Sequence, residues 1–225
     1  MTSVATLQPF ATARTRRQSR ALQGPSCAEG LYARVFEDIL EGQFTAGLSE
    51  DLLMQTYAAG RSEVRRVVSR LTHQRVIHAR PNQRARVNEP DAHQIRQVLQ
   101  ARRMAESTVI QLLCASVDGS AIDSLQMLIL RERQSIEERL HSTAIRLGGE
   151  FHLQLARMAG NAPMMHFLEG LIPLTGLALA ARSLVHGQGW QVRQAILDAL
   201  QAGNAREGTE RIMQYLQQLE TLAVG

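Results

Sequence analysis

The sequence predicts a mainly helical protein: three short helices with a small two-stranded hairpin, followed by an all-helical bundle of six or seven helices. Three observations support this fold class. Apolar residues recur at helical spacing along most of the chain, only 4% of residues are aromatic, and there is no series of alternating, strand-like segments. We divide the 225 residues into a basic arm (1–28), a first domain (29–89) and a helical domain (90–225).

Charge is distributed unevenly along the chain. All 25 cationic residues are arginine, against 21 acids, which gives a net charge of +4. Residues 1–90 hold 13 arginines and 8 acids, whereas residues 91–225 hold 12 arginines and 13 acids. The positive charge therefore belongs to the N-terminal part. Guanidinium groups stay charged at physiological pH and favour a polyanionic or carboxylate partner.

The first 28 residues contain four arginines and no acid. This composition is typical of a disordered basic arm and also of an organelle transit peptide, whereas a secretory signal would need an apolar stretch after the charges. The longest apolar run, 171–181, contains Pro173 and is too short to span a membrane, so we predict no membrane partner. Two cysteines cannot form a disulfide framework, and we expect a cytoplasmic protein.

Three helices are predicted in the first domain. Apolar residues keep helical spacing over 31–40 and stop before Gly42. Ser49, followed by two acids, is typical of a helix N-cap and begins a second helix that ends near Tyr57. The third helix covers about 61–73. Its valines and leucine lie on one face, which leaves most of its arginines on the other.

Two short extended stretches follow, 76–80 and 84–88, joined by a Pro-Asn-Gln turn. Three short helices and a two-stranded wing constitute a winged helix-turn-helix. Residues 60–86 contain eight arginines and one acid, Glu63, whereas a solvated charged face normally mixes signs. This composition indicates a nucleic-acid-binding surface.

A helix fits the major groove, where arginine binds the O6 and N7 atoms of guanine. Arg61 and Arg65, near the start of the third helix, are placed for that contact, while wing arginines would bind phosphates or enter the minor groove. The residues that we predict to contact double-stranded DNA are Arg61, Ser62, Arg65, Arg66, Arg70, Arg80, Asn82, Arg84 and Arg86.

The order and spacing of these motifs resemble the GntR family of bacterial transcription regulators. The matching residues are Ile39-x-x-Gly42-x-Phe44-x-x-Gly47, Leu48-Ser49-Glu50, Arg61-Ser62-x-Val64-Arg65 and Arg80-Pro81-Asn82 ahead of Val87. The family usually reads Ser-Arg-Thr-Pro-Val-Arg at the recognition helix. This chain keeps both arginines but has Gly60 and Glu63 in place of the serine and proline, and Arg84 in place of the wing glycine.

The second domain resembles the FCD ligand-binding domain of the FadR subfamily. Its helices are expected at about 91–116, 121–146, 148–159, 162–184 with possible breaks, 190–202 and 204–222. The resembling residues are Arg102-x-x-x-Glu106, Phe151-His152, Gly160-Asn161, residues 195–200 and Tyr215-Leu216. The resemblance implies a homodimer on a roughly palindromic operator, and a repressor that a metabolite releases.

Many FCD domains hold a divalent metal with an aspartate, a histidine four residues later and two further histidines. The corresponding positions here are Gly148, His152, Arg193 and Tyr215, so one ligand of four is left. Because a single histidine cannot complete a metal site, we predict no metal and no other cofactor. Nothing in the spacing of His166 or His186 indicates that either replaces the missing ligands.

Several polar residues interrupt the apolar stripes of the bundle helices, which indicates a ligand pocket or a closed internal network. We expect Arg193 to take over the role of the metal as the anchor for a small organic acid. The alternatives are an i,i+4 ion pair on the first bundle helix, an exposed Arg193, and a histidine and tyrosine that belong to the core. The candidate effector-binding residues are Arg102, Glu106, His152, Asn161, Arg193 and Tyr215.

Two other classes of function fit the sequence less well than a DNA-binding regulator. The sequence has no Gly-rich phosphate loop, no nucleophile motif and no pair of histidines at metal-binding spacing, so an enzyme is not expected. A helical sensor or protein-interaction module that has lost specific DNA binding remains the alternative, because the serine and proline of the family are missing beside Arg61.

Overall fold

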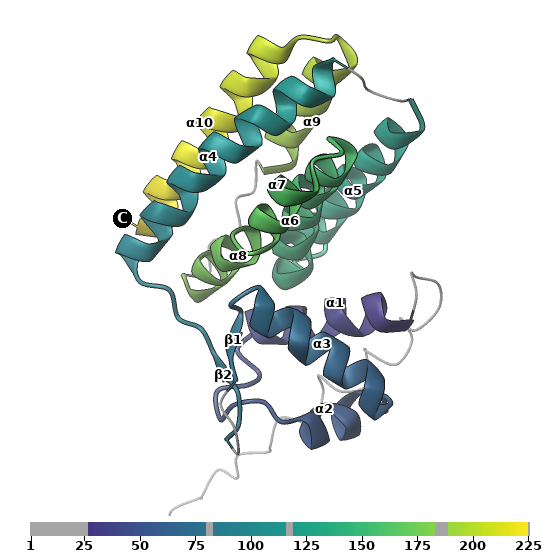
Figure 1. Ribbon diagram of the computed structural model, residues 1–225, viewed down its shortest axis with the longest axis vertical. Helices are drawn as coiled ribbons and strands as arrows, with labels where there is room; N and C mark the ends of the chain where they lie inside the picture. The colour runs from purple at the N-terminus through teal and green to yellow at the C-terminus, as the bar shows by residue number, and fades with distance from the viewer. Residues whose placement is uncertain (1–26, 80–82, 116–118, 183–188, 225) are drawn as a thin grey trace, which may run out of the picture.

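The computed structural model describes residues 27–79, 83–115, 119–182 and 189–224. Figure 1 shows three helices and a two-stranded sheet below a larger group of helices, which confirms the predicted fold class. The elements are α1 (Cys27–Leu40), α2 (Glu50–Tyr57), α3 (Arg61–His73), β1 (Ile77–His78), β2 (Arg86–Val87), α4 (Ala92–Cys114), α5 (Gly119–Glu137), α6 (His141–Met158), α7 (Ala162–Glu169), α8 (Ile172–Ala181), α9 (Gly189–Gln201) and α10 (Ala205–Val224). We call α1–α3 with the sheet the head, and α4–α10 the bundle.

The head forms as local signals predict. The Ser49 side chain accepts a hydrogen bond from the Leu52 N–H (3.2 Å) and caps α2. Helix α3 ends where Arg75 takes a left-handed conformation (φ 56°). There the Val76 N–H donates to the Leu71 carbonyl (2.9 Å), as in a Schellman motif. The three helices enclose an apolar core in which Val35, Val64 and Leu71 are fully buried.

Gly47, the last residue of the Ile39–Gly47 motif, lies where the wing contacts the loop between α1 and α2. Gly47 has φ +87°, and a Cβ there would lie 2.9 Å from the carbonyl oxygen of Ala85. This close approach exists because Leu48 and Ala85 form an antiparallel bridge with N–H···O distances of 2.7 and 2.8 Å. The loop between α1 and α2 therefore adds to the small sheet, in which Ile77 pairs with Val87.

The bundle differs from expectation at one helix boundary. A break was predicted near Gly148, but α5 ends at Glu137 and α6 runs from His141 through Gly148 to Met158. The chain turns at Arg139, which takes a left-handed conformation (φ 58°), and the Leu140 N–H donates to the Ser135 carbonyl (2.7 Å). The two glycines of α6 allow neighbours to approach, because a Cβ at Gly149 would lie 3.2 Å from Ile172.

The predicted segment 162–184 is divided into α7 and α8. Among the described residues, 162–181 is the one stretch whose length and apolar composition would suit a membrane span. Half of it is buried within the protein, and a turn at Gly170 interrupts it. These two helices supply core residues of the bundle, and Leu168 is fully buried.

The head packs directly on the bundle. Figure 1 shows α1 beneath α6 and α8, and Leu174 and Leu177 of α8 belong to the apolar cluster of the head. At the edge of this contact, Arg146 Nε donates to Glu37 Oε1 (2.8 Å) across the two parts. The two parts are therefore joined by side-chain packing as well as by the connecting chain.

Candidate functional site

The N-terminal half of α3 carries exposed arginines. Arg61, Ser62, Arg65 and Arg66 are all exposed, while Val64 on the opposite face is fully buried in the head core. Figure 1 shows this end of α3 beside α2, far from the bundle. The structure thus places four of the predicted DNA-contacting residues together on one accessible surface.

Two of these arginines already contact carboxylates of α2. Arg65 Nε donates to Glu50 Oε2 (3.1 Å), and Arg61 lies 3.7 Å from Asp51. The side chains of both arginines are about 60% exposed, and ion pairs in such positions contribute about 0–1 kcal/mol. Either guanidinium can therefore leave its carboxylate partner at small cost.

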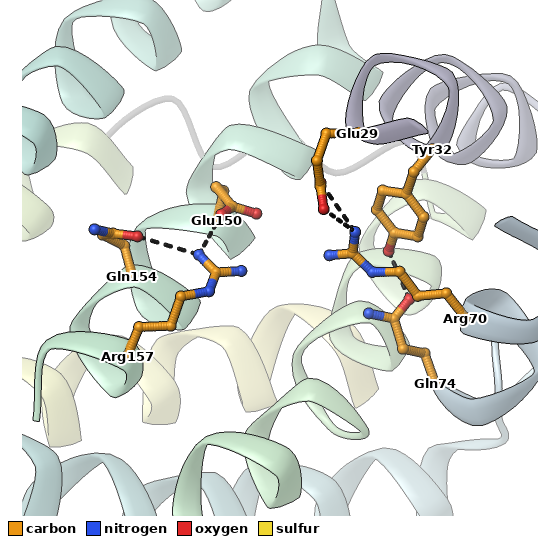
Figure 2. A network of polar contacts seen from close by, with 7 residues as sticks. All are labelled: Glu29, Tyr32, Arg70, Gln74, Glu150, Gln154 and Arg157. Atoms are coloured by element: carbon orange, nitrogen blue, oxygen red, sulfur yellow. Dashed lines mark hydrogen bonds and ion pairs between the residues drawn. The ribbon is translucent and has the colours of Figure 1, made fainter. Parts of the chain in front are cut away.

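Arg70, at the C-terminal end of α3, lies apart from these arginines and contacts α1. Its Nη1 donates to both carboxylate oxygens of Glu29 at 3.0 Å, and its guanidinium carbon lies 3.9 Å from the centre of the Tyr32 ring. Figure 2 shows this group opposite Glu150 and Arg157 of α6. Unlike the other arginines of α3, Arg70 is placed between the head and the bundle.

The wing contributes further cations. Arg84 and Arg86 are exposed beside and within β2. The predicted contacts Arg80 and Asn82 lie outside the described residues. The described part of the wing therefore presents two guanidinium groups, which is compatible with contacts to the phosphate backbone.

The four positions that correspond to the metal ligands of the family do converge in the bundle, but a guanidinium occupies their centre. Arg193 Nε donates to the Gly148 carbonyl (3.3 Å), and Nη2 donates to the Tyr215 hydroxyl (2.5 Å). The His152 ring stacks on Tyr215 at 5.2 Å between centroids. A Cβ at Gly148 would overlap the Arg193 guanidinium, so this close packing requires glycine.

These residues do not fit a divalent metal. Arginine, tyrosine and glycine supply no ligand of the usual kind, and the described residues hold no group of three His, Cys, Asp or Glu that could bind a metal. Arg193 is 5% exposed, so the alternative of an exposed side chain is wrong. The fixed positive charge of Arg193 lies among the four positions that the resemblance aligns with metal ligands.

Sequence reasoning missed the acid that balances this charge. Glu132 of α5 is buried, and its Oε1 accepts a hydrogen bond from Arg193 Nη1 (2.8 Å). Burial raises the pKa of the Glu132 carboxyl, and the Arg193 guanidinium partly offsets this effect. One signal was available, since Glu132 continues the apolar stripe that contains Leu125 and Ile129.

A second buried ion pair lies beside the first. Arg102 Nε donates to Glu106 Oε1 (2.6 Å), as the i,i+4 alternative predicted, and Nη1 donates to the Thr175 hydroxyl of α8 (3.0 Å). Glu106 Oε2 lies 2.7 Å from His152 Nδ1. These contacts link α4, α6 and α8 in the centre of the bundle.

The protonation states in this cluster are fixed by burial and by neighbouring charges. Burial alone would raise the pKa of Glu106, but Arg102 and His152 outweigh it and lower that pKa to about 2. Burial lowers the pKa of His152 to about 4, against the opposite effect of Glu106. At neutral pH Glu106 is therefore charged and His152 is neutral. The proton of the neutral His152 ring is assigned to Nδ1, because Nδ1 lies beside the Glu106 carboxylate, which can only accept. The other ring nitrogen, Nε2, is then an acceptor.

A cavity adjoins this cluster, with about 60 Å³ of space for the centres of water molecules. Of the predicted effector residues, Arg102, His152, Arg193 and Tyr215 line it. Glu106 is not among the lining residues and accepts a hydrogen bond from Arg102. Asn161 has a different role, because its side chain accepts a hydrogen bond from the Met164 N–H (3.1 Å) and caps α7.

The wall of the cavity includes residues of the head. Tyr32 and Phe36 of α1 line it together with residues of α6 and α8. The Tyr32 hydroxyl donates to Gln74 Oε1 (2.7 Å), immediately after α3 (Figure 2). The ring of Tyr32 also lies under the guanidinium of Arg70. A single head residue therefore contacts both the cavity and the C-terminal end of α3.

Comparisons with known proteins agree with both parts of the fold. The family of bacterial regulatory proteins named gntR matches residues 27–87, and the FCD domain matches residues 97–218. A comparison with curated proteins found no match.

Similar solved structures share the fold over most of their length. McbR/YncC of Escherichia coli has a TM-score of 0.71 at 17% identity, covering 89% of this chain and 98% of the other. A GntR transcriptional regulator from Rhodococcus sp. RHA1 has a TM-score of 0.69 at 20% identity, with 88% and 97% covered. Lar of Listeria monocytogenes has a TM-score of 0.56 at 16% identity, with 90% and 98% covered.

The head and the bundle are each matched by one family, in the order found in the similar structures. Proteins with this pair of domains are transcriptional regulators and not enzymes. The chain belongs to the GntR family of DNA-binding regulators, in the group whose C-terminal domain is of the FCD type.

Proposed function

We propose that this regulator is a cytoplasmic repressor, that it binds its operator as a homodimer, and that a small effector with a carboxylate group releases it. The observation that carries the proposal is the cavity beside the buried polar cluster of the bundle, whose wall includes Tyr32 of the head. Tyr32 in turn contacts Gln74 and Arg70 at the end of the DNA-binding helix. Occupation of the cavity can therefore act on the helix that reads DNA.

In the DNA-bound state, the start of α3 enters the major groove. Arg61 and Arg65 leave their carboxylate partners on α2 and contact guanine, and Arg66 contacts a phosphate. Arg84 and Arg86 of the wing contact the backbone. Two heads related by a twofold axis would bind the two halves of a palindromic operator.

The carboxylate of the effector is bound by Arg102 rather than by Arg193. All three nitrogens of the Arg193 guanidinium donate to protein acceptors, one of which is the carboxylate of Glu132. Arg102 Nη2 is buried and has no hydrogen-bond partner among the described residues. A carboxylate in the cavity would supply that partner, in a charge-assisted hydrogen bond.

Release of DNA follows if the ligand favours a different placement of α1. The Tyr32 and Phe36 rings lie against the cavity, so a ligand that displaces them moves the residues that hold the end of α3. The ligand can change the DNA affinity only by the difference between its affinities for the two arrangements. Coupling of this kind is typically about 1–3 kcal/mol.

Apolar side chains on the outer surface of the bundle support a dimer. Met104 and Leu112 of α4 and Met213 of α10 are exposed, and α4 and α10 lie side by side in Figure 1. A second copy packed on these helices would remove these apolar side chains from water. Sedimentation at equilibrium gives the mass of the particle and tests this part of the proposal directly.

The DNA-binding part is tested by the variant Arg65→Ala. Loss of a bidentate guanine contact costs about 1–3 kcal/mol, and we expect a corresponding weakening of specific binding. Fluorescence anisotropy with labelled fragments from the DNA upstream of the coding sequence measures it, and a salt series counts the phosphate contacts. Arg206→Ala removes an exposed arginine of α10 and is the matched control.

Two results would contradict this assignment. If Arg65→Ala and Arg206→Ala bind the operator equally well, α3 does not read bases through Arg65. If the wild-type protein shows no preference for its own upstream DNA over unrelated DNA at any salt concentration, the sensor module that has lost specific DNA binding becomes the correct description.

A further inference from the structure

Three buried polar atoms at the cavity lack a partner among the described residues. They are Arg102 Nη2, Glu132 Oε2 and His152 Nε2, and all three residues line the cavity. His152 Nδ1 and Glu106 Oε2 also make no hydrogen bond of good geometry, but they lie 2.7 Å from each other and so have a polar neighbour within the protein. Their residues are between 2% and 4% exposed. Buried polar groups are rarely left without a hydrogen bond, so a molecule that completes these three is expected in the cavity.

The chemical types of these atoms differ. Arg102 Nη2 is a charged donor and calls for an anionic acceptor. Glu132 Oε2 is a carboxylate oxygen, and His152 Nε2 is an acceptor because Nδ1 lies at the Glu106 carboxylate. Both of these acceptors call for a donor, and a positively charged donor suits Glu132 best. A ligand that satisfies all three carries both kinds of group.

The charges around the cavity lead to the same conclusion. The guanidinium groups of Arg102 and Arg193 are paired with the carboxylates of Glu106 and Glu132, and His152 is neutral. The two other charged residues of the cavity wall, Arg146 and Glu150, have opposite signs, so the site has no net charge. A ligand with one or two uncompensated negative charges would leave a buried excess of charge, which is unfavourable in such a site.

We propose that the effector is a small zwitterion, an aliphatic α-amino acid, with its carboxylate on Arg102 and its ammonium group on Glu132 and His152. The proposal rests on the proposed function and names the ligand class of the same cavity. Apolar side chains complete the cavity wall and would contact the aliphatic part of the ligand; they are Phe36, Leu153, Ile172, Leu179 and Leu219. The space of about 60 Å³ for the centres of water molecules restricts the ligand to a small size.

The test compares an amino acid with analogues that each lack one charged group. Isothermal titration calorimetry of the full chain uses glycine, L-alanine, L-valine and L-leucine as probes, up to about 10 mM. For the amino acid that binds best, the analogue without the ammonium group and the one without the carboxylate are titrated in parallel. For L-valine these are isovalerate and isobutylamine. We expect each analogue to bind at least about tenfold more weakly, or not measurably.

Two variants assign the ammonium site. Glu132→Gln should weaken the binding of the amino acid by about tenfold or more and leave the weak binding of the carboxylate analogue unchanged. Glu137→Gln changes an exposed acid on the same helix and should have no effect on either ligand. If Glu132→Gln does not fold, as judged by circular dichroism, the comparison of analogues on the wild-type protein still decides the proposal.

The outcomes separate this proposal from the proposed function. Equal binding of the amino acid and its carboxylate analogue, or no binding of any of the four amino acids, overturns the zwitterion and leaves a carboxylate effector intact. Binding of an amino acid that leaves the DNA affinity unchanged supports the ligand class and contradicts effector-driven release of DNA. Binding that weakens the DNA affinity supports both.

Discussion

Replacement of Arg193 by methionine tests whether the buried guanidinium holds the bundle together. The variant Arg193→Met keeps a long side chain but leaves the buried carboxylate of Glu132 without its cation. It also removes the hydrogen bonds to Tyr215 and to the Gly148 carbonyl. Removal of one partner of a buried ion pair costs about 3–5 kcal/mol, a large fraction of the roughly 5–15 kcal/mol that stabilises a typical domain.

The double variant Glu132→Leu/Arg193→Met distinguishes this explanation from a simple loss of packing. With both charges replaced by apolar side chains of similar size, no group is left unpaired, and such replacements are often neutral or stabilising. We therefore expect the double variant to recover most of the stability that Arg193→Met loses. With the single variant Glu132→Leu added, the cycle is complete and gives the energy of coupling between the two residues.

Urea unfolding provides the measurement. Far-ultraviolet circular dichroism follows the helices, and fluorescence follows Trp190, the single tryptophan, which lies on α9 three residues before Arg193. The two signals must give the same midpoint for the free energies to be compared. A loss below about 1 kcal/mol for Arg193→Met, or a double variant no more stable than the single one, would refute the structural role of the pair.

Two further predictions concern the cluster and the wing. The pKa of His152 is lowered from 6.5 to about 4 in the folded state, so the unfolded chain takes up a proton first as the pH falls and stability is lost between these values. From pH 7.5 to pH 5 this amounts to about 2 kcal/mol, and His152→Asn should remove that part of the dependence; urea midpoints at the two pH values decide it. Gly47→Ala adds a Cβ 2.9 Å from the Ala85 carbonyl oxygen at a positive φ. We expect this variant to lose about 1–3 kcal/mol of stability and to bind the operator more weakly, because the wing is displaced. An unchanged urea midpoint and DNA affinity would show that the wing does not depend on this close approach.

The head could be predicted from sequence because its signals are local. The Ser49 cap, the glycine after α1 and the apolar face of α3 each fix an element through residues a few positions apart. Gly47 is a partial exception. The motif that ends at Gly47 could be identified in the sequence. The need for glycine there could not, because it depends on the bridge between Leu48 and Ala85, which are far apart in the chain.

The features that sequence reasoning missed depend on tertiary contacts. The end of α5 is made by Arg139 in a left-handed conformation, which arginine seldom takes, so the residue itself carries no signal. Arg70 resembles its neighbours in α3, and only its position opposite Glu29 and Tyr32 separates it from them. Glu132 was recognisable as an acid in an apolar stripe, but its partner lies 61 positions away.

Two buried arginines of the bundle have different surroundings, which indicate different tasks. The Arg193 guanidinium connects four helices, through Glu132 on α5, Gly148 on α6, Tyr215 on α10 and its own place on α9. Because Glu132 neutralises it, this cation is a weak attractor for a free carboxylate. The remaining donor is Arg102, which bonds to Thr175 on α8, and α8 packs against the head. Under the proposed function, the structural charge and the ligand-binding charge of this chain are therefore different residues, Arg193 and Arg102, and Arg102 is bonded to the helix that packs against the head.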